Sequence, residues 1–157
     1  MHTVKTQFDL HTRLFNNVLS EITDDQADSR ANDKINHLKW LAGHVTSARM
    51  GLGKFGGLDE DKSMEEFFGH GKGIDPSKNY PSLKEIQEKW NFISDKISTG
   101  LENIPTEVLS SDAPVQVPVS DPSMEGFLGF MMHHEAYHIG QMGILRKFMG
   151  KEAMSYK

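Results

Sequence analysis

The sequence predicts an all-α fold, a four-helix bundle that forms a single domain over residues 1–157. Three observations support this prediction. Four segments carry apolar residues three and four positions apart, which is the period of an amphipathic helix. Ser82 and Glu85 form a capping box, which marks the start of a helix. No strand-rich segment is visible, and 157 residues are enough to bury one core.

The first predicted helix covers residues 4–22, where apolar residues recur at helical spacing. His11 lies within its apolar stripe and is therefore expected to face inward. Residues 23–33 are polar and acidic, which predicts a loop.

The second predicted helix covers residues 35–52, and Asn32 or Asp33 is its expected cap. His44 lies on the apolar side of this helix, so it is also expected to point into the bundle. The first two helices thus each carry one inward-facing histidine.

A long connector, residues 51–81, separates the second and third helices. It contains one expected helical turn at residues 63–68 and is otherwise irregular. About thirty residues without a long helix are unusual inside a compact domain. This length is enough to carry the chain from one end of a bundle to the other. The third helix then begins after Ser82 and ends near Gly100.

The fourth helix is the longest and follows a second connector, residues 104–120, in which Pro114 and Pro118 argue against a helix. Asp121 is the expected cap, and Pro122 occupies the first helical position, which proline favours. The helix is expected to run to about Met149, with Gly150 as the residue that ends it.

The composition excludes several classes of function. The net charge is −5 and no large lysine or arginine cluster occurs, so nucleic-acid binding is not expected. No apolar run reaches the roughly 20 residues of a membrane span, and the N-terminus lacks the apolar core of a secretory signal. Cysteine is absent, which excludes disulfides, thiolate ligands and a cysteine nucleophile. A cytoplasmic location is expected.

Three histidines form the predicted metal site. His134 and His138 are four residues apart on the apolar face of the fourth helix, and such partners can bind one ion together. His44, on another helix, is the expected third ligand. Three neutral imidazoles suit zinc, nickel, iron or copper, and three protein ligands leave a position open for water or substrate. The alternative is a set of buried neutral histidines bonded to other protein groups.

Other polar residues near this pattern have weaker assignments. His11 is a candidate base that lies near the metal without binding it, and its alternative is a partly buried packing role. Gln141 either orients the imidazole of a ligand or bonds a neighbouring helix. His133 is expected to face the flank or solvent, and His37 an end or exposed rim of the bundle. His70 receives no role.

The spacing of His134, Glu135 and His138 also satisfies the HExxH pattern of metalloproteases. Such a protease would use Glu135 as its general base and would usually take a third ligand from downstream. Only a short tail follows here, and no strands are expected. We therefore reject this interpretation and expect Glu135 to be solvated.

Two motifs resemble those of a known family. Leu38 to His44, LKWLAGH, resembles the second-helix ligand motif of the DinB-like (YfiT-like) metalloproteins. His134 to Gln141, HEAYHIGQ, resembles their last-helix HxxxHxGQ motif. The resemblance covers essentially the whole chain.

The resemblance implies an up-down-down-up bundle, which the long crossover between the second and third helices would permit. It implies that His44, His134 and His138 bind a divalent metal. Nickel and zinc are the first candidates, and iron is a third. It also implies a homodimer, since many members are dimers. Characterised relatives include thiol S-transferases that use bacillithiol or mycothiol, and a mycothiol-dependent maleylpyruvate isomerase.

Two functional hypotheses follow. In the first, the protein is a metal-dependent enzyme, a thiol S-transferase or a hydrolase, whose small-molecule substrate could be a low-molecular-weight thiol. His11 would then be the candidate proton shuttle. In the second, the protein is a non-catalytic stress protein that binds a metal or a small ligand.

Overall fold

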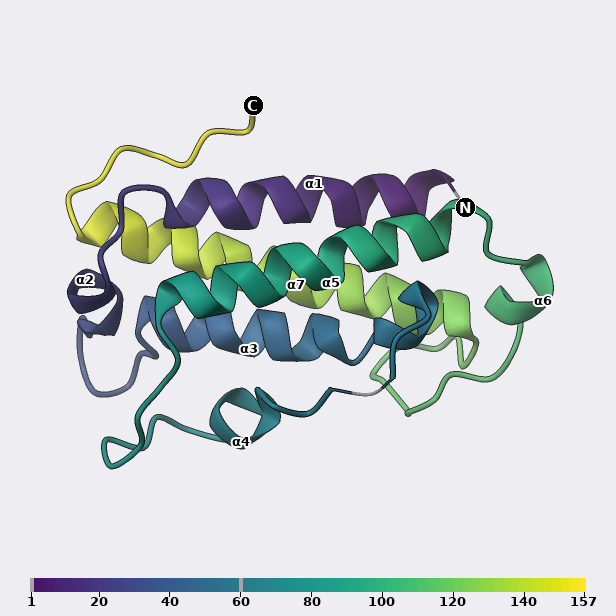
Figure 1. Cartoon of the computed structure of the whole chain (residues 1–157), viewed down its shortest axis with the longest axis horizontal. Coiled ribbons are helices and arrows are strands. Elements are labelled where there is room, and N and C mark those ends of the chain that lie inside the picture. Colours follow the sequence, from purple (N-terminus) through teal and green to yellow (C-terminus); the bar gives the residue numbers. More distant parts are fainter. Residues whose placement is uncertain (1, 60) are drawn as a thin grey trace.

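The computed structural model describes residues 2–59 and 61–157 and shows an all-α bundle (Figure 1). Within that part of the chain no strand is present. The four long helices are α1 (His2–Leu19), α3 (Leu38–Met50), α5 (Leu83–Glu102) and α7 (Met124–Phe148). The predicted fold class is confirmed.

The four long helices follow the expected course. α1 and α7 run in one direction, α3 and α5 in the other, so the order along the chain is up-down-down-up (Figure 1). α1 and α3 each pack against both α5 and α7, which places α1 diagonally opposite α3. The long connector after α3 carries the chain back along the bundle, so that α5 runs parallel to α3. The helices α3 and α7, which carry the three predicted ligands, are direct neighbours.

The starts of two helices differ from the prediction. α3 begins after His37, whose Nδ1 accepts the Trp40 backbone N–H at 2.9 Å, and not after Asn32 or Asp33. α7 begins after Ser123, whose side chain accepts the Gly126 N–H. The expected cap of α7, Asp121, instead accepts the backbone N–H of Ser123 at 2.9 Å. In both helices, the side chain of the residue before the helix accepts a backbone N–H of the first turn. Hydrophobic periodicity does not reveal such a bond.

Other helix ends agree better with the sequence. Ser82 and Glu85 form the predicted capping box at the start of α5. Gly150, with φ of 75°, ends α7 as expected. α1 stops at Leu19, three residues earlier than predicted, because Glu21 adopts a left-handed conformation with φ of 61°.

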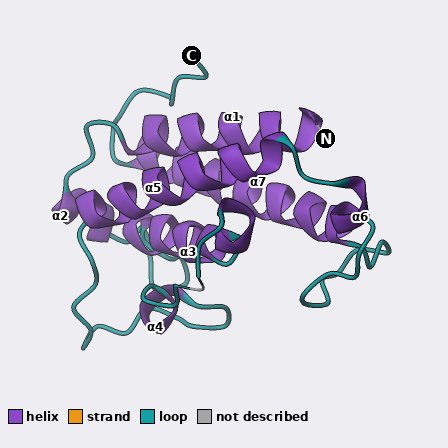
Figure 2. Ribbon diagram, turned by 45° about the vertical axis from the view of Figure 1, so that its right-hand side comes forward, coloured by secondary structure: helices purple, strands orange, loops and turns teal. Residues whose placement is uncertain are grey.

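Short helices occupy the connectors. The predicted turn at residues 63–68 is α4 (Glu65–Phe68), which lies outside the bundle beside α3 (Figure 2). η1 (Gly53–Gly56) and α6 (Thr106–Leu109) occupy the other irregular segments. α2 (Asp24–Asp28) forms where a loop was predicted, because Thr23 and Gln26 make a capping box. No helix in the described residues is both long and apolar enough to cross a bilayer.

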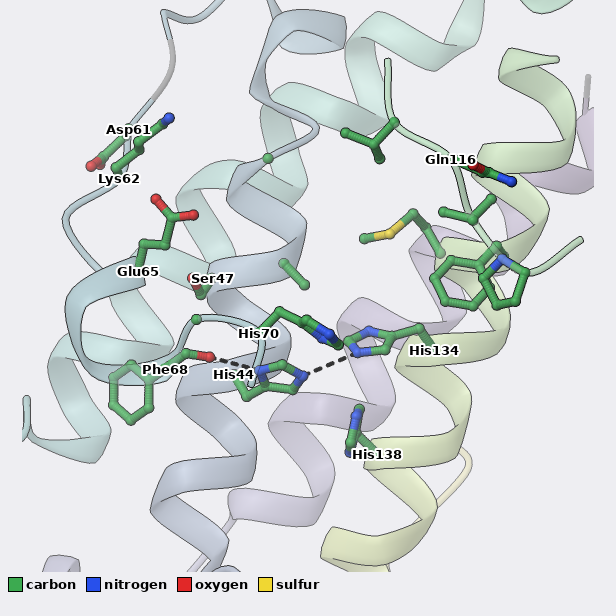
Figure 3. Close-up of a pocket in the computed structure, with 18 residues that line it drawn as sticks. His44, Ser47, Asp61, Lys62, Glu65, Phe68, His70, Gln116, His134 and His138 are labelled. Carbon is green, nitrogen blue, oxygen red and sulfur yellow. Dashed lines mark hydrogen bonds between the residues drawn. The ribbon is translucent and has the colours of Figure 1, made fainter. Parts of the chain in front are cut away.

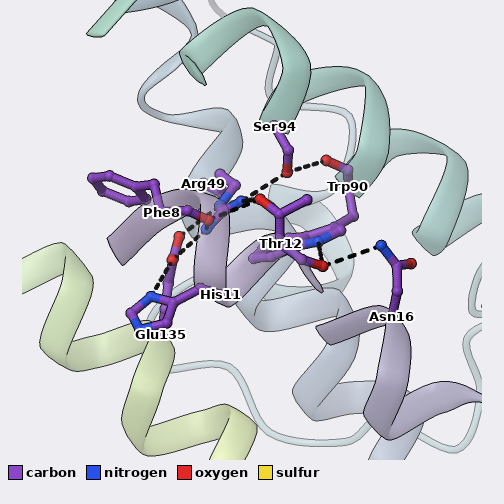
Figure 4. Close-up of polar contacts among 8 residues, drawn as sticks. All are labelled: Phe8, His11, Thr12, Asn16, Arg49, Trp90, Ser94 and Glu135. Atoms are coloured by element: carbon purple, nitrogen blue, oxygen red, sulfur yellow. Dashed lines mark hydrogen bonds and ion pairs between the residues drawn. The ribbon is translucent and has the colours of Figure 1, made fainter. Parts of the chain in front are cut away.

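A fully buried ion pair joins α3 to α7 in the core (Figure 4). Arg49 donates from Nε and Nη2 to the two carboxylate oxygens of Glu135, at 2.7 and 2.5 Å. Its Nη1 donates to the hydroxyls of Thr12 and Ser94 at 2.6 and 2.7 Å. Nη2 also donates to the Phe8 carbonyl at 3.3 Å. These five hydrogen bonds match the five N–H groups of the guanidinium.

The partners of Arg49 come from the three other long helices. Phe8 and Thr12 belong to α1, Ser94 to α5 and Glu135 to α7, and the Trp90 ring of α5 lies 3.7 Å from the guanidinium carbon. This polar cluster fixes the position of α3 relative to α7 along their common interface.

Candidate metal centre

The structure brings the three predicted ligands together (Figure 3). His44 projects from α3, and His134 and His138 project from α7. One ring nitrogen from each lies within 4.8 Å of the other two, and the Nε2 atoms of His44 and His134 are 3.1 Å apart. No fourth histidine, cysteine or carboxylate joins this group in the described residues.

Hydrogen bonds fix the protonation of two of the rings. His44 Nδ1 lies 2.7 Å from the Phe68 carbonyl oxygen, and His138 Nδ1 lies 2.7 Å from Gln141 Oε1. A carbonyl oxygen can only accept, so each Nδ1 carries its hydrogen and each Nε2 keeps a lone pair. The Gln141 amide group is oriented in turn because its Nε2 donates to the Tyr137 hydroxyl at 3.2 Å. Gln141 thus occupies the ligand-orienting position considered above.

All three rings are expected to be neutral near pH 7. Burial lowers the pKa of His134 to about 4, with the nearby rings of His138 and His44 adding to the effect. Burial also lowers the pKa of His44, and it lowers the pKa of His138 despite the opposing effect of the hydrogen bond that His138 donates to Gln141. Neutral imidazoles are the form that binds a metal ion.

This donor set fits a divalent transition metal. Two nitrogens bound to one ion at about 2.0–2.1 Å in tetrahedral geometry lie about 3.3 Å apart, close to the 3.1 Å between His44 and His134. His134 Nδ1 is buried and has no hydrogen-bond partner among the described residues, so the protein does not fix its proton. His134 can therefore also present an Nε2 lone pair to an ion.

A cavity of about 780 Å³ opens over the three histidines. One wall is apolar and comes from α7 and the connector before it. It consists of Val115, Val117, Pro118, Phe130 and Met131. The opposite side is more polar and comes from α3 and the region around α4, including Ser47, Asp61, Glu65 and His70. A cavity of this size accommodates a small-molecule ligand.

Glu135 is not solvated, contrary to the prediction. It is fully buried and paired with Arg49, and it also accepts a hydrogen bond from His11 Nδ1 at 3.0 Å. Burial raises its pKa, but the charge and hydrogen bonds of Arg49 outweigh this and hold the pKa below its usual value. The Glu135 side chain faces the core and is absent from the cavity lining, which agrees with the rejection of the HExxH interpretation.

The remaining histidines occupy different surroundings. His11 is buried against Glu135 and does not line the cavity, so its position favours the packing alternative over a base beside the metal. His133 is exposed, as predicted. His37 lies at the N-terminal end of α3, which agrees with the predicted bundle end, but it is only 5% exposed and so does not lie on an exposed rim. His70, to which no role was assigned, lines the cavity, and the glycines on both sides of it were the available signal.

Comparison with protein-family models identifies the family of this chain. Residues 7–142 match the family model described as DinB superfamily. A search of curated proteins and a search of solved structures each gave no match. The matched region contains all three clustered histidines and covers most of the chain. The chain therefore belongs to the DinB superfamily.

Proposed function

We propose that this protein is a metal-dependent enzyme of the thiol S-transferase or hydrolase type. His44, His134 and His138 hold a divalent ion, zinc or nickel, and leave one side of it open to the cavity. The observation that carries this proposal is that the three rings converge on one point. In two of them, a carbonyl oxygen accepts the Nδ1 hydrogen, which leaves the Nε2 lone pair free for an ion. A group with three protein ligands at the floor of a cavity is typical of catalytic rather than structural sites.

A bound ion would supply Lewis acidity, which lowers the pKa of a coordinated water or thiol and so makes a nucleophile available near neutral pH. The chain contributes the surroundings for that chemistry. The Phe68 carbonyl and Gln141 orient two of the ligand rings. Phe130, Met131 and the 115–118 segment form an apolar wall beside them, which limits water and can contact the apolar part of an electrophile.

A second candidate is a non-catalytic metal-binding protein, and the origin of the ligands on two neighbouring helices supports it. An ion held by α3 and α7 together would link them and raise stability without any reaction. This candidate predicts a large gain in melting temperature on metal binding and no turnover. The enzyme predicts turnover that depends on the metal.

Metal analysis of purified variants tests the shared part of both candidates. We expect His44→Ala, His134→Ala and His138→Ala each to abolish tight binding of one ion per chain. His133→Ala is the matched control, because it removes an exposed histidine next to a ligand and should bind metal normally. Equal metal content in the wild type and the three ligand variants would refute the proposed centre.

A reaction screen then separates the two candidates. The metal-loaded protein is incubated with low-molecular-weight thiols and electrophiles, and separately with a panel of esters. The enzyme proposal expects product formation by the wild type that chelator removes and that the ligand variants lack. A protein that binds metal and gains stability, but turns over no member of either panel, would favour the non-catalytic candidate.

A further inference from the structure

His70 lines the cavity but is not one of the three proposed ligands. It lies at the cavity with the three clustered histidines but comes from a different part of the chain, directly after α4. In Figure 3 its ring is directed toward His134. The His70 residue itself is exposed, so it stands at the mouth of the cavity and not in its floor.

A tight turn holds His70 in this position. The Lys72 backbone N–H donates to the Gly69 carbonyl at 3.1 Å, which closes a β-turn with His70 at its second position. Gly71 occupies the third position with φ of 74°, a conformation that favours glycine. The geometry is that of a type II turn. The turn is braced further because Lys72 Nζ donates to the Glu66 carbonyl at 3.1 Å.

The turn is anchored to the metal-binding helix through Phe68. The Phe68 ring is fully buried and packs on Gly43, where even one added methyl group would lie 2.4 Å from the ring. The Phe68 carbonyl, two residues before His70, accepts the hydrogen bond from His44. The backbone that orients a ligand ring therefore also positions His70.

His70 lies near the ligands without belonging to their group. Its charge contributes to lowering the pKa of both His44 and His134, although burial is the main cause in each case. It is absent from the set of nitrogens that lie within 4.8 Å of one another. Its ring therefore lies outside the three-histidine group but lines the same cavity, on the side from which the three rings can be reached.

We propose that His70 is a substrate-contacting residue that donates an imidazole N–H hydrogen bond to an anionic oxygen, nitrogen or sulfur atom bound at the open side of the three-histidine group. The inference rests on the proposed function, because it requires an ion that draws the anion to this position. An imidazole carries at least one N–H whether it is neutral or protonated, so His70 can donate this hydrogen bond in either state. It would favour small anionic nucleophiles, such as thiolates, over neutral ligands of the same size.

Cobalt-loaded protein and azide provide the test, since visible absorption reports both cobalt binding and the arrival of an anion. We compare the wild type with His70→Ala and His70→Gln, whose amide can still donate a hydrogen bond. His133→Ala is the matched control. The dissociation constants for cobalt and for azide are measured separately, and circular dichroism checks that every variant is folded.

We expect His70→Ala to leave cobalt affinity and the azide-free spectrum unchanged and to weaken azide binding about tenfold, the size expected for a lost hydrogen bond to a charged group. His70→Gln should recover part of the loss, and His133→Ala should bind azide like the wild type.

Three results would overturn this inference alone: unchanged azide affinity in His70→Ala, no azide binding by the cobalt-loaded wild type, or a changed azide-free spectrum in His70→Ala. The last result would make His70 a metal ligand. Failure of the wild type to bind cobalt would instead overturn the proposed metal centre, and the role of His70 with it.

Discussion

Replacing Glu135 by glutamine would test the buried ion pair that joins α3 to α7. Glutamine has nearly the same shape but no charge, so Arg49 would remain fully buried beside a neutral group. Removing one partner of a buried pair costs about 3–5 kcal/mol. For a chain of this size each kcal/mol lowers the melting temperature by about 2–4 °C, so we expect a decrease of about 6–20 °C.

Urea denaturation followed by circular dichroism at pH 7 measures this loss directly. The double variant Arg49→Met with Glu135→Leu is the control, because it removes both charges and should keep most of the stability that Glu135→Gln loses. A loss below about 1 kcal/mol in Glu135→Gln would refute the reasoning, since Arg49 would then be satisfied without its carboxylate.

Acid adds a second check on the same pair. The pKa of Glu135 is lowered in the folded state, so its contribution is present above the ordinary carboxyl pKa of about 4.3 and is lost as the pH falls through the lower folded value. The stability difference between the wild type and Glu135→Gln should therefore shrink in strong acid. A difference that stays constant across this range would contradict the assignment of an ionised Glu135.

Three further substitutions test the cap of α3 and the surroundings of the candidate metal centre. Burial lowers the pKa of His37 in the folded protein, where its neutral ring caps α3. The unfolded chain therefore binds a proton at this residue more readily than the folded protein, and stability should decrease as the pH falls below about 6.5. His37→Asn keeps a capping side chain without titrating, and the melting temperature should then fall less between pH 7.5 and 5.5; an identical fall in both proteins would refute this. Gly43→Ala should displace the Phe68 ring, lower stability by about 1–3 kcal/mol and weaken cobalt binding, and normal melting and cobalt affinity would show that the contact is not tight. Gln141→Ala removes the acceptor of His138 and should lower metal affinity about 10–100-fold in a chelator competition, whereas Gln141→Glu should retain most of it. Equal affinity in Gln141→Ala and the wild type would exclude an orienting role.

The grouping of the three clustered histidines could be anticipated from the sequence because helix periodicity is a local property. Residues four apart on one helix are neighbours whatever the rest of the fold does, which placed His134 beside His138. His44 could be placed opposite them because it lies on the apolar side of its helix, and that side was expected to face the bundle. The bundle course likewise followed from connector length together with the family resemblance.

The environment of Glu135 was missed because it depends on a partner far away in the sequence. Arg49 lies 86 residues earlier, and nothing local to either residue indicates the pairing. Periodicity did contain a signal, since Leu128, Ile139 and Met142 are buried and share the face of Glu135. A charged residue on such a face was interpreted as solvated, whereas the structure buries it with a counter-charge.

The roles of His37 and His70 were not predicted, for different physical reasons. His37 was expected at an end or exposed rim of the bundle, and its role as the cap of α3 was not foreseen because sequence rules favour serine, threonine, aspartate and asparagine at a cap. The position of His70 depends on the turn at residues 69–72. The buried Phe68 ring and the hydrogen bond from Lys72 to the Glu66 carbonyl hold that turn, and local sequence patterns indicate neither contact.

The Phe68 peptide group has a consequence for how the cavity would open. Its carbonyl holds the ring of His44 while the turn that follows it forms part of the entrance. Any outward movement of α4 large enough to widen the entrance would also break the hydrogen bond that orients the His44 ring. The affinity of the three-histidine group for an ion would then decrease. A molecule too large for the entrance, which can bind only if α4 moves, should therefore promote loss of a bound ion. A molecule that fits beneath the turn should leave the ion in place.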